Sequence, residues 1–101
     1  MMNVAIIGTG AISTAHIRGY LEFQDRCKIV AMCDIYPEKA EKQAKEFNLD
    51  AAVFSDYQEL VKQENIDLVS VCTPPYTHAD IAIAALNHGK HVLVEKPMAS
   101  S

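Results

Sequence analysis

Short hydrophobic runs alternate with segments of helical period along the whole chain. The runs are of strand length and almost entirely apolar, as expected for strands that are buried on both faces of a sheet. The runs lie at residues 4–7, 28–33, 51–54, 67–72 and 91–94, and the helical segments lie at 12–23, 38–47, 56–63 and 77–87. This alternation predicts a parallel α/β sheet of five strands joined by right-handed crossovers.

The helical segments carry face and boundary signals. In the first segment, small and apolar residues recur at steps of three and four, which is typical of one helix face. The predicted inward face consists of Ile12, Ala15, His16, Gly19, Tyr20 and Phe23. On that face His16 is expected to be a packed histidine rather than a catalytic base. Pro37 suits the first turn of the second helix, and Gly89 suits the end of the last one.

A glycine-containing turn connects the first predicted strand to the first helix. Its sequence, Gly8-Thr9-Gly10-Ala11-Ile12-Ser13, follows the G-x-G-x-x-G/A pattern of dinucleotide-binding proteins, with serine at the third small position. Gly8 permits the tight turn, Gly10 leaves room for a pyrophosphate, and Ser13 lets the helix approach the sheet. The helix N-terminus then offers N–H groups to the phosphates. A purely structural glycine turn is the alternative interpretation.

Asp34 strengthens the nucleotide interpretation. It follows the second strand, 24 residues after Gly10, near the spacing at which an acidic residue accepts hydrogen bonds from the adenosine ribose. The alternative is an aspartate that caps the turn before Pro37. With turn, strand and carboxylate in this order, the sequence predicts a doubly wound, Rossmann-type sheet of order 3-2-1-4-5. Residues 1–101 are expected to form one dinucleotide-binding domain.

Composition narrows the range of partners. The 101 residues are 50% hydrophobic and carry a net charge of −4 without any basic stripe, so nucleic acid is not an expected partner. No apolar stretch reaches the ~20 residues of a membrane span, and the N-terminus does not read as a signal peptide. The three cysteines lack metal-ligand spacing, which predicts neither a metal site nor disulfides and favours a reduced, cytoplasmic protein.

The segment Glu95-Lys96-Pro97 follows the last predicted strand. In an open parallel sheet, ligands bind beyond the carboxyl ends of the strands. A lysine at this position is therefore expected to point toward the place where a cofactor and a substrate meet. The alternative is a surface lysine that precedes a proline.

Two segments resemble the Gfo/Idh/MocA family, which comprises the glucose–fructose oxidoreductase and inositol dehydrogenase-like enzymes. They are Cys72-Thr73-Pro74-Pro75-Tyr76-Thr77-His78 and the block ALNHGKHVLVEKP at residues 85–97. The resemblance spans essentially the whole chain and covers that family's N-terminal Rossmann domain. Its GKHV…EKP part is specific, whereas the glycine turn alone fits many families. The family's second, substrate-binding domain, with its catalytic Asp and His, is absent from residues 1–101.

The resemblance implies roles for individual residues. The glycine turn at residues 8–12 would contact the cofactor, and Asp34 would contact its adenosine ribose. Thr73, Pro74 and His78 would lie along the nicotinamide half. Glu95 and Lys96 would face the nicotinamide and the substrate, with Lys96 as the catalytic lysine. The implied cofactor-site residues are Gly8, Thr9, Gly10, Ala11, Ile12, Asp34, Thr73, Pro74, His78, Glu95 and Lys96. The resemblance also implies a cis Lys96–Pro97 peptide bond, and a full-length parent that forms a homo-oligomer.

Two functional hypotheses remain open at this point. The first is the cofactor domain of an NAD-dependent oxidoreductase that transfers a hydride between nicotinamide and a sugar, cyclitol or similar polyol. In it, Lys96 stabilises the developing oxyanion or relays the proton, and the general base comes from the missing domain. The second is a non-catalytic module that senses NAD(H) or docks a partner, which has no use for Lys96. Residues 1–101 alone are expected to bind cofactor without turnover.

NAD is the expected cofactor rather than NADP. A 2′-phosphate would stand beside the Asp34 carboxylate, and like charges ~4 Å apart repel by about 1 kcal/mol even in water. An arginine normally clamps a 2′-phosphate. Here Ile35, Tyr36 and Pro37 follow Asp34, and Lys39 lies a helical turn further on. Repulsion without compensation predicts a preference for NAD of about 10- to 100-fold.

Overall fold

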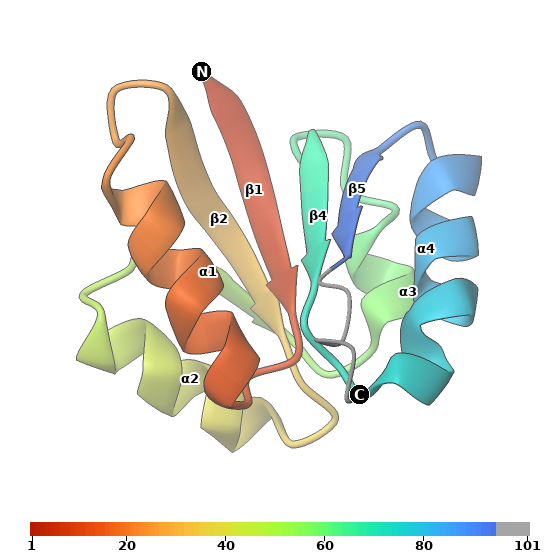
Figure 1. Cartoon of the computed structure of the whole chain (residues 1–101), viewed down its shortest axis with the longest axis horizontal. Coiled ribbons are helices and arrows are strands. Elements are labelled where there is room, and N and C mark those ends of the chain that lie inside the picture. Colours follow the sequence, from red (N-terminus) through yellow and green to blue (C-terminus); the bar gives the residue numbers. More distant parts are fainter. Residues whose placement is uncertain (95–101) are drawn as a thin grey trace, which may run out of the picture.

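A computed structural model describes residues 1–94, which form one parallel sheet with helices on both faces (Figure 1). The strands are β1 (Met2–Ile7), β2 (Cys27–Cys33), β3 (Ala52–Phe54), β4 (Leu68–Val71) and β5 (His91–Val94). All pairings are parallel, and the strand order is β3-β2-β1-β4-β5. The predicted doubly wound topology is therefore confirmed.

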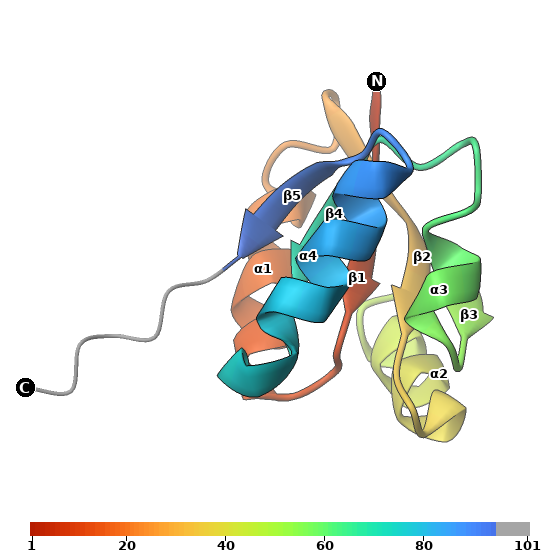
Figure 2. The same ribbon diagram turned by 90° about the vertical axis from the view of Figure 1, so that its right-hand side faces the viewer.

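The helices divide between the two faces according to the direction in which the chain moves along the sheet. From β1 to β3 the chain moves one way, and α1 (Ala11–Leu21) and α2 (Pro37–Glu46) cover one face (Figure 1). It then crosses back to β4 and β5, and α3 (Tyr57–Leu60) and α4 (His78–Asn87) cover the other face (Figure 2). A 3₁₀ turn, η1 (Pro75–Thr77), leads into α4. Right-handed crossovers require this division.

The hydrophobic core has two halves, one on each face of the sheet. Val4 and Ile6 of β1 belong to the half beneath α1 and α2, whereas Ala5 and Ile7 belong to the half beneath α3 and α4. All four side chains are at most 2% exposed. Because both faces are covered, successive residues must all be apolar, which explains why the strands lack polar alternation.

The buried face of α1 differs from the predicted one. Its buried residues are Ser13, His16 and Ile17. Four members of the predicted face are instead exposed: Ile12, Ala15, Gly19 and Phe23. The prediction was wrong because the first turn of α1 borders a cleft, where Ile12 is left uncovered, and because Phe23 lies beyond the end of the helix. The prediction that His16 is packed is confirmed, since it is 8% exposed.

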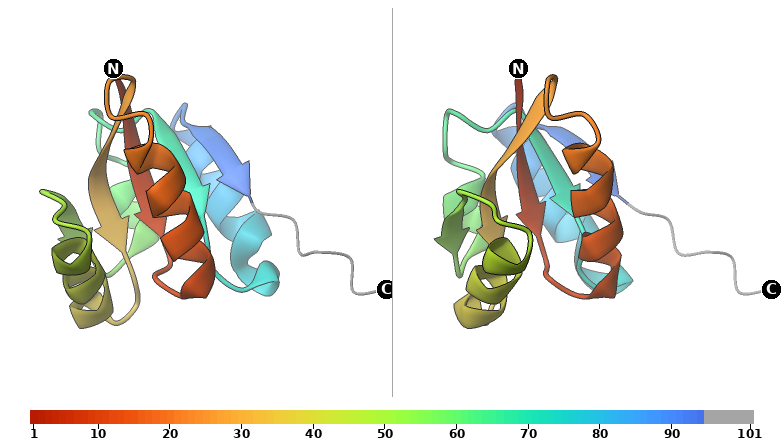
Figure 3. Two further views of the ribbon diagram at one scale, coloured as in Figure 1. Left: turned by 60° about the vertical axis from the view of Figure 1, so that its left-hand side comes forward. Right: turned by 90° about the vertical axis from the view of Figure 1, so that its left-hand side faces the viewer.

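The parallel strands all begin at one edge of the sheet and all end at the opposite edge. We call these the amino edge and the carboxyl edge. The strands' carboxyl ends gather at one edge, together with the β1–α1 turn and the start of α2, opposite the N-terminus (Figure 3). In parallel α/β sheets this is the edge at which ligands bind. Within residues 1–94, no helix is long and apolar enough to cross a membrane.

Candidate functional site: a cleft at the carboxyl edge of the sheet

A cleft of about 940 Å³ lies at the carboxyl edge of the sheet. Its walls are the β1–α1 turn, the start of α2, the β3–α3 connection and the β4–α4 connection. The cleft opens where β1 is flanked by β2 on one side and β4 on the other, which is the point at which the strand order reverses. Its size falls within the range of small-molecule and cofactor sites.

Gly8 is required by the fold itself. Its φ is +95°, a left-handed conformation that L side chains rarely adopt. A Cβ at this position would lie 2.9 Å from the carbonyl carbon of Cys72 and 2.9 Å from Cγ2 of Thr73. The Gly8 N–H also donates to the carbonyl of Cys33 at 2.8 Å. The turn is therefore pressed between β2 and the end of β4, with no room for a side chain.

Gly10 has no such structural requirement. A Cβ on Gly10 would meet no protein atom within 4 Å among the residues described, and its φ of −80° suits any L residue. The space in front of Gly10 belongs to the cleft. The lack of a side chain there leaves an approach to the backbone, which is what a pyrophosphate needs.

Unpaired backbone donors face the same space. Across residues 1–94, the N–H groups of Gly10, Ala11 and Ile12 have no hydrogen-bond acceptor, and no side chain caps α1. Helix N-termini leave such groups for water or for an anionic ligand. In a protein with a net charge of −4, these local donors offer a phosphate a binding site without any cluster of cations.

Ser13 connects this turn to α2. Its side chain is fully buried, and its hydroxyl lies 2.6 Å from the carbonyl of Gly10, to which it donates. The Nε2 of Gln43 donates to the same hydroxyl at 2.9 Å. A buried hydroxyl is destabilising unless it is hydrogen-bonded. The hydrogen bond from Gln43 therefore explains how a serine fits the third small position of the pattern. The role of Gln43 was not predicted from the sequence.

Asp34 combines the two interpretations that the sequence left open. One carboxylate oxygen, Oδ1, accepts from the N–H of Tyr36 at 2.8 Å, so the residue does cap the turn after β2. The other, Oδ2, accepts from the N–H of Thr9 at 3.2 Å and from its hydroxyl at 2.5 Å. A carboxylate has about four acceptor positions, so roughly one remains. The half-buried Asp34 lines the cleft, where that position is available to a ligand hydroxyl.

The β4–α4 connection supplies the opposite wall. Thr73 and Pro74 line the cleft, but His78 is not among its lining residues. Instead, Nε2 of His78 lies 2.6 Å from the carbonyl oxygen of Thr73. The hydroxyl of Thr77 also contacts that of Thr73, at 2.5 Å. In this structure His78 thus supports the loop from behind, and its contact with a cofactor stays a prediction.

Three sequence-based expectations cannot be compared with the structure. Glu95, Lys96 and the cis Lys96–Pro97 bond lie outside the described residues. The proposed position of the catalytic lysine therefore stays a prediction.

The sequence analysis did not assign several of the cleft residues to the site. They include Tyr36 at the start of α2, Lys39 in its first turn, Asp56 and Tyr57 after β3, and Tyr76 after β4. The β3–α3 residues could have been found from the rule that loops after parallel strands border the ligand site. No local signal marks Lys39, whose Nζ lies 5.0 Å from the centre of the Tyr36 ring.

Cys33 lines the cleft without being reactive. Burial raises the pKa of its thiol to about 12, and the neighbouring charges of Asp34 and Asp56 act in the same direction. The thiolate is the nucleophilic form of cysteine. At neutral pH Cys33 is therefore a small apolar group in the wall of the site.

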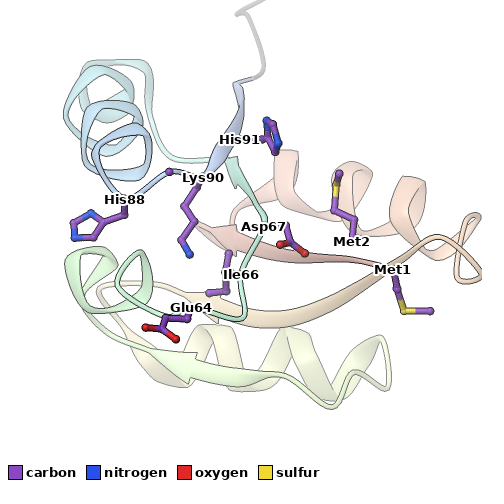
Figure 4. A pocket seen from close by; sticks show the side chains of 9 residues that line it. Met1, Met2, Glu64, Ile66, Asp67, His88, Lys90 and His91 are labelled. Carbon is purple, nitrogen blue, oxygen red and sulfur yellow. The ribbon is translucent and has the colours of Figure 1, made fainter.

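A second hollow, of about 650 Å³, lies at the opposite edge, where the strands begin (Figure 4). Lys90, from the GKHV block, is 9% exposed and donates from Nζ to the carbonyl of Gln63 at 2.6 Å. Figure 4 shows its side chain reaching toward the segment that carries Glu64 and Ile66. Asp67 likewise accepts from the N–H of Asn3 at 2.8 Å. Lys90 is thus a structural lysine that joins β5 to the end of the α3 region.

Comparison with known proteins agrees with this geometry. Residues 2–101 match the model of the oxidoreductase family with an NAD-binding Rossmann fold, the Gfo/Idh/MocA family. The chain belongs to this family. It is 37% identical over 98 residues to inositol 2-dehydrogenase of Azotobacter vinelandii and 32% identical to that of Salmonella typhimurium, in each case covering 97% of this chain and 29% of the relative. The chain thus spans about three tenths of the length of these relatives.

Solved structures show the same fold with a bound nicotinamide cofactor. The WlbA dehydrogenase of Bordetella pertussis, in complex with NADH and UDP-GlcNAcA, has a TM-score of 0.84 and 35% identity, covering 99% of this chain and 30% of that one. Levoglucosan dehydrogenase in complex with NADH has a TM-score of 0.87 and 31% identity, covering 95% of this chain and 27% of that one. The chain is therefore an NAD-binding Rossmann domain.

Proposed function

We propose that this chain is the cofactor-binding part of a dehydrogenase that moves a hydride between nicotinamide and a sugar, cyclitol or similar polyol. The observation that carries the proposal is the cleft in which three unpaired N–H groups stand beside the open face of Gly10, with Asp34 on the next strand end. The similar proteins support the substrate class, because they are an inositol 2-dehydrogenase, a levoglucosan dehydrogenase and a dehydrogenase in complex with UDP-GlcNAcA.

Each part of the cleft has a role in this proposal. The backbone of Gly8, Thr9, Gly10, Ala11 and Ile12 binds the pyrophosphate. Asp34 accepts a hydrogen bond from the adenosine ribose. The loop that carries Thr73, Pro74 and His78 borders the nicotinamide half. Bound NAD supplies the hydride acceptor, so the chain's own work is to hold and orient it.

The proton chemistry falls to residues beyond the described part. We assign Glu95 to the nicotinamide region and Lys96 to the catalytic position, where its cation stabilises the oxyanion that develops as the substrate hydroxyl loses its proton. The general base comes from a second, substrate-binding domain of a longer protein, in which residues 1–101 are the dinucleotide-binding domain. That longer protein is expected to be a homo-oligomer in the cytoplasm, in keeping with cysteines that lack disulfide spacing.

Binding and turnover test different parts of the proposal. The 101-residue chain should bind NAD in a calorimetric titration, and it should form no NADH when a polyol such as myo-inositol is added. A folded chain that does not bind NAD would contradict the cofactor role. NADH formation by the chain alone would contradict the assignment of the base to a second domain. In the longer protein, Lys96→Ala should abolish turnover.

A further inference from the structure

The turn between β1 and α1 is held by two residues from the second strand–helix unit. On one side, Asp34 at the end of β2 accepts from the N–H and the hydroxyl of Thr9. On the other side, Gln43 in α2 donates from Nε2 to the hydroxyl of Ser13 at 2.9 Å, and Figure 1 shows α1 and α2 on the same face of the sheet. Ser13 is 0% exposed, Gln43 is 7% exposed, and neither lines the cleft. An effect of Gln43 on a ligand must therefore pass through the turn.

The carbonyl of Gly10 is held by two donors of Ser13. The N–H of Ser13 donates to it at 3.2 Å, and the hydroxyl donates to it at 2.6 Å. This carbonyl shares one planar, trans peptide unit with the N–H of Ala11, and in such a unit the C=O and the N–H point in opposite directions. Holding the carbonyl on the protein side therefore holds the Ala11 N–H toward the cleft, which Ala11 lines.

Gln43 determines how the Ser13 hydroxyl is oriented. Its Nε2 donates to the hydroxyl, and its Oε1 lies 3.1 Å from the same oxygen. A serine hydroxyl has a single proton, and the shorter of its two acceptor contacts is the one to the Gly10 carbonyl. A donated hydrogen bond also strengthens the bond that the hydroxyl itself makes. Without the amide, the hydroxyl loses the partner that fixes its rotation, and its hold on the carbonyl weakens.

We propose that Gln43 is a positioning residue for the phosphate-binding turn, which acts through Ser13 to fix the direction of the Ala11 N–H and thereby sets part of the affinity for the cofactor's pyrophosphate. This inference rests on the proposed cofactor role of the cleft. The dinucleotide-binding pattern has glycine or alanine at the third small position, where no side chain can donate to the turn. Serine at this position adds such a donor, and the donor depends on a partner from α2.

The test is a double-mutant cycle in cofactor affinity. NAD is titrated calorimetrically into the wild-type chain, Gln43→Met, Ser13→Ala and the double variant, because methionine keeps the length of the side chain but cannot donate. Gln43→Met should weaken NAD binding about fivefold, which is the size of effect expected from one hydrogen bond. In the Ser13→Ala background the same change should alter the affinity less than about twofold, because the hydroxyl that transmits the effect is absent.

A control variant separates positioning from the stability of α2. Ala44→Gly changes the next residue of the same helix, which is 6% exposed, does not line the cleft and has no side-chain hydrogen-bonding group. Glycine destabilises a helix interior, so this variant should melt at a lower temperature and keep the wild-type NAD affinity. If Gln43→Met does not fold, Gln43→Asn, whose side chain is one methylene shorter, takes its place in the cycle.

The amide signal of Ala11 provides a second readout by NMR of the isotope-labelled chain. Gln43→Met should shift this signal in the free protein, and NAD should move it less than in the wild type. Ala44→Gly should leave the Ala11 signal at its wild-type position. A role of Gln43 in stability alone would not reorient this N–H.

Three results would overturn the inference. The first is wild-type NAD affinity in a folded Gln43→Met. The second is an equal loss of affinity in the serine and alanine backgrounds, which would mean that Gln43 does not act through Ser13. The third is an equal loss in Gln43→Met and Ala44→Gly, which would mean that affinity follows the stability of α2. Failure of the wild-type chain to bind NAD contradicts the proposed function instead, and the Ala11 signal of the free chain then still decides whether Gln43 positions the turn.

Discussion

The amino edge and the carboxyl edge of the sheet each have a hollow, and the two hollows are of comparable size. They differ in whether their polar groups are hydrogen-bonded within the domain. At the amino edge, the Nζ of Lys90 and the carboxylate of Asp67 are paired with backbone groups of the same domain. At the carboxyl edge, the N–H groups of Gly10, Ala11 and Ile12 have no acceptor in the described residues. Unpaired donors that remain within reach of a cleft are available to a ligand, whereas paired ones serve the fold. Volume alone does not distinguish the two hollows.

The block at residues 85–97, which carries the family resemblance, contains two lysines with different roles. Lys90 lies at the amino edge and is buried there, so it joins two segments of the fold. Lys96 was predicted to lie at the carboxyl edge, beyond the described residues. One short block therefore combines a residue for the fold with a residue proposed for chemistry. Predictions that separate stability from cofactor binding test this division.

The largest expected effect is on stability at Gly8. Gly8→Ala forces a side chain into a left-handed conformation and into 2.9 Å contacts with Cys72 and Thr73. The free energy of unfolding should fall by about 3 kcal/mol, measured by urea denaturation. Gly19→Ala is the control, because it lies in α1 and its Cβ would meet nothing within 4 Å. The control should be neutral or slightly stabilising. Equal stability of the two variants would contradict the strained turn.

The next effect is on cofactor binding at Gly10. Gly10→Val places a branched side chain in the open space before the turn. NAD affinity should fall by about 100-fold or more, or about 2.7 kcal/mol, because the pyrophosphate can no longer approach the backbone. The thermal melt should not change. If a folded variant binds NAD as tightly as the wild type, then the carboxyl-edge cleft is not the cofactor site.

The amino edge should respond in the opposite way. Lys90→Met removes the donor to the carbonyl of Gln63, so stability should fall by about 1–2 kcal/mol while NAD affinity stays constant. Lys62→Met is the control, since Lys62 is 60% exposed and its ion pair with Glu59 is a surface contact. If Lys90→Met is fully folded and still loses NAD affinity, then the amino edge also takes part in cofactor binding, and the two edges do not have separate roles.

The smallest effect concerns cofactor choice. Asp34→Asn removes the negative charge and keeps an oxygen for the Tyr36 N–H. The ratio of NAD to NADP affinity should fall by about fivefold, because the charge that repels a 2′-phosphate is gone. Titration of both cofactors into the variant and the wild type gives the ratio. An unchanged ratio would mean that Asp34 acts only as a turn cap.

The topology could be predicted from sequence because it depends on a local pattern. Strands covered on both faces must be continuously apolar, and β5 was predicted with its observed bounds, His91–Val94. The inward face of α1 could not be predicted in this way. Ile12 is apolar and at helical spacing, yet it is 48% exposed because it borders the cleft. Whether Ile12 is buried depends on which part of the fold lies opposite it, and the spacing of apolar residues carries no information about that.

The same distinction holds for the site. Gly8, Gly10 and Asp34 were found because their spacing reflects the geometry of one strand–turn–helix unit and the next strand end. Gln43 was not found, because it acts through Ser13, 30 positions away. Lys39 was named but not assigned to the site, because only the placement of α2 brings it beside the cleft. Contacts between elements arise from the assembled fold, and a single sequence has no local signal for them.

The central position of β1 has a consequence for how the chain acquires its structure during synthesis. β1 leaves the ribosome well before β4, yet it pairs with β4 along one side, and the bond between Asn3 and Asp67 spans 64 positions. Contacts this distant in sequence form slowly, because the intervening chain must be ordered before they stabilise it. β1 must therefore wait until Leu68–Val71 has been made before the sheet can close around it. Nascent chains that stop short of β4 should remain open to proteases.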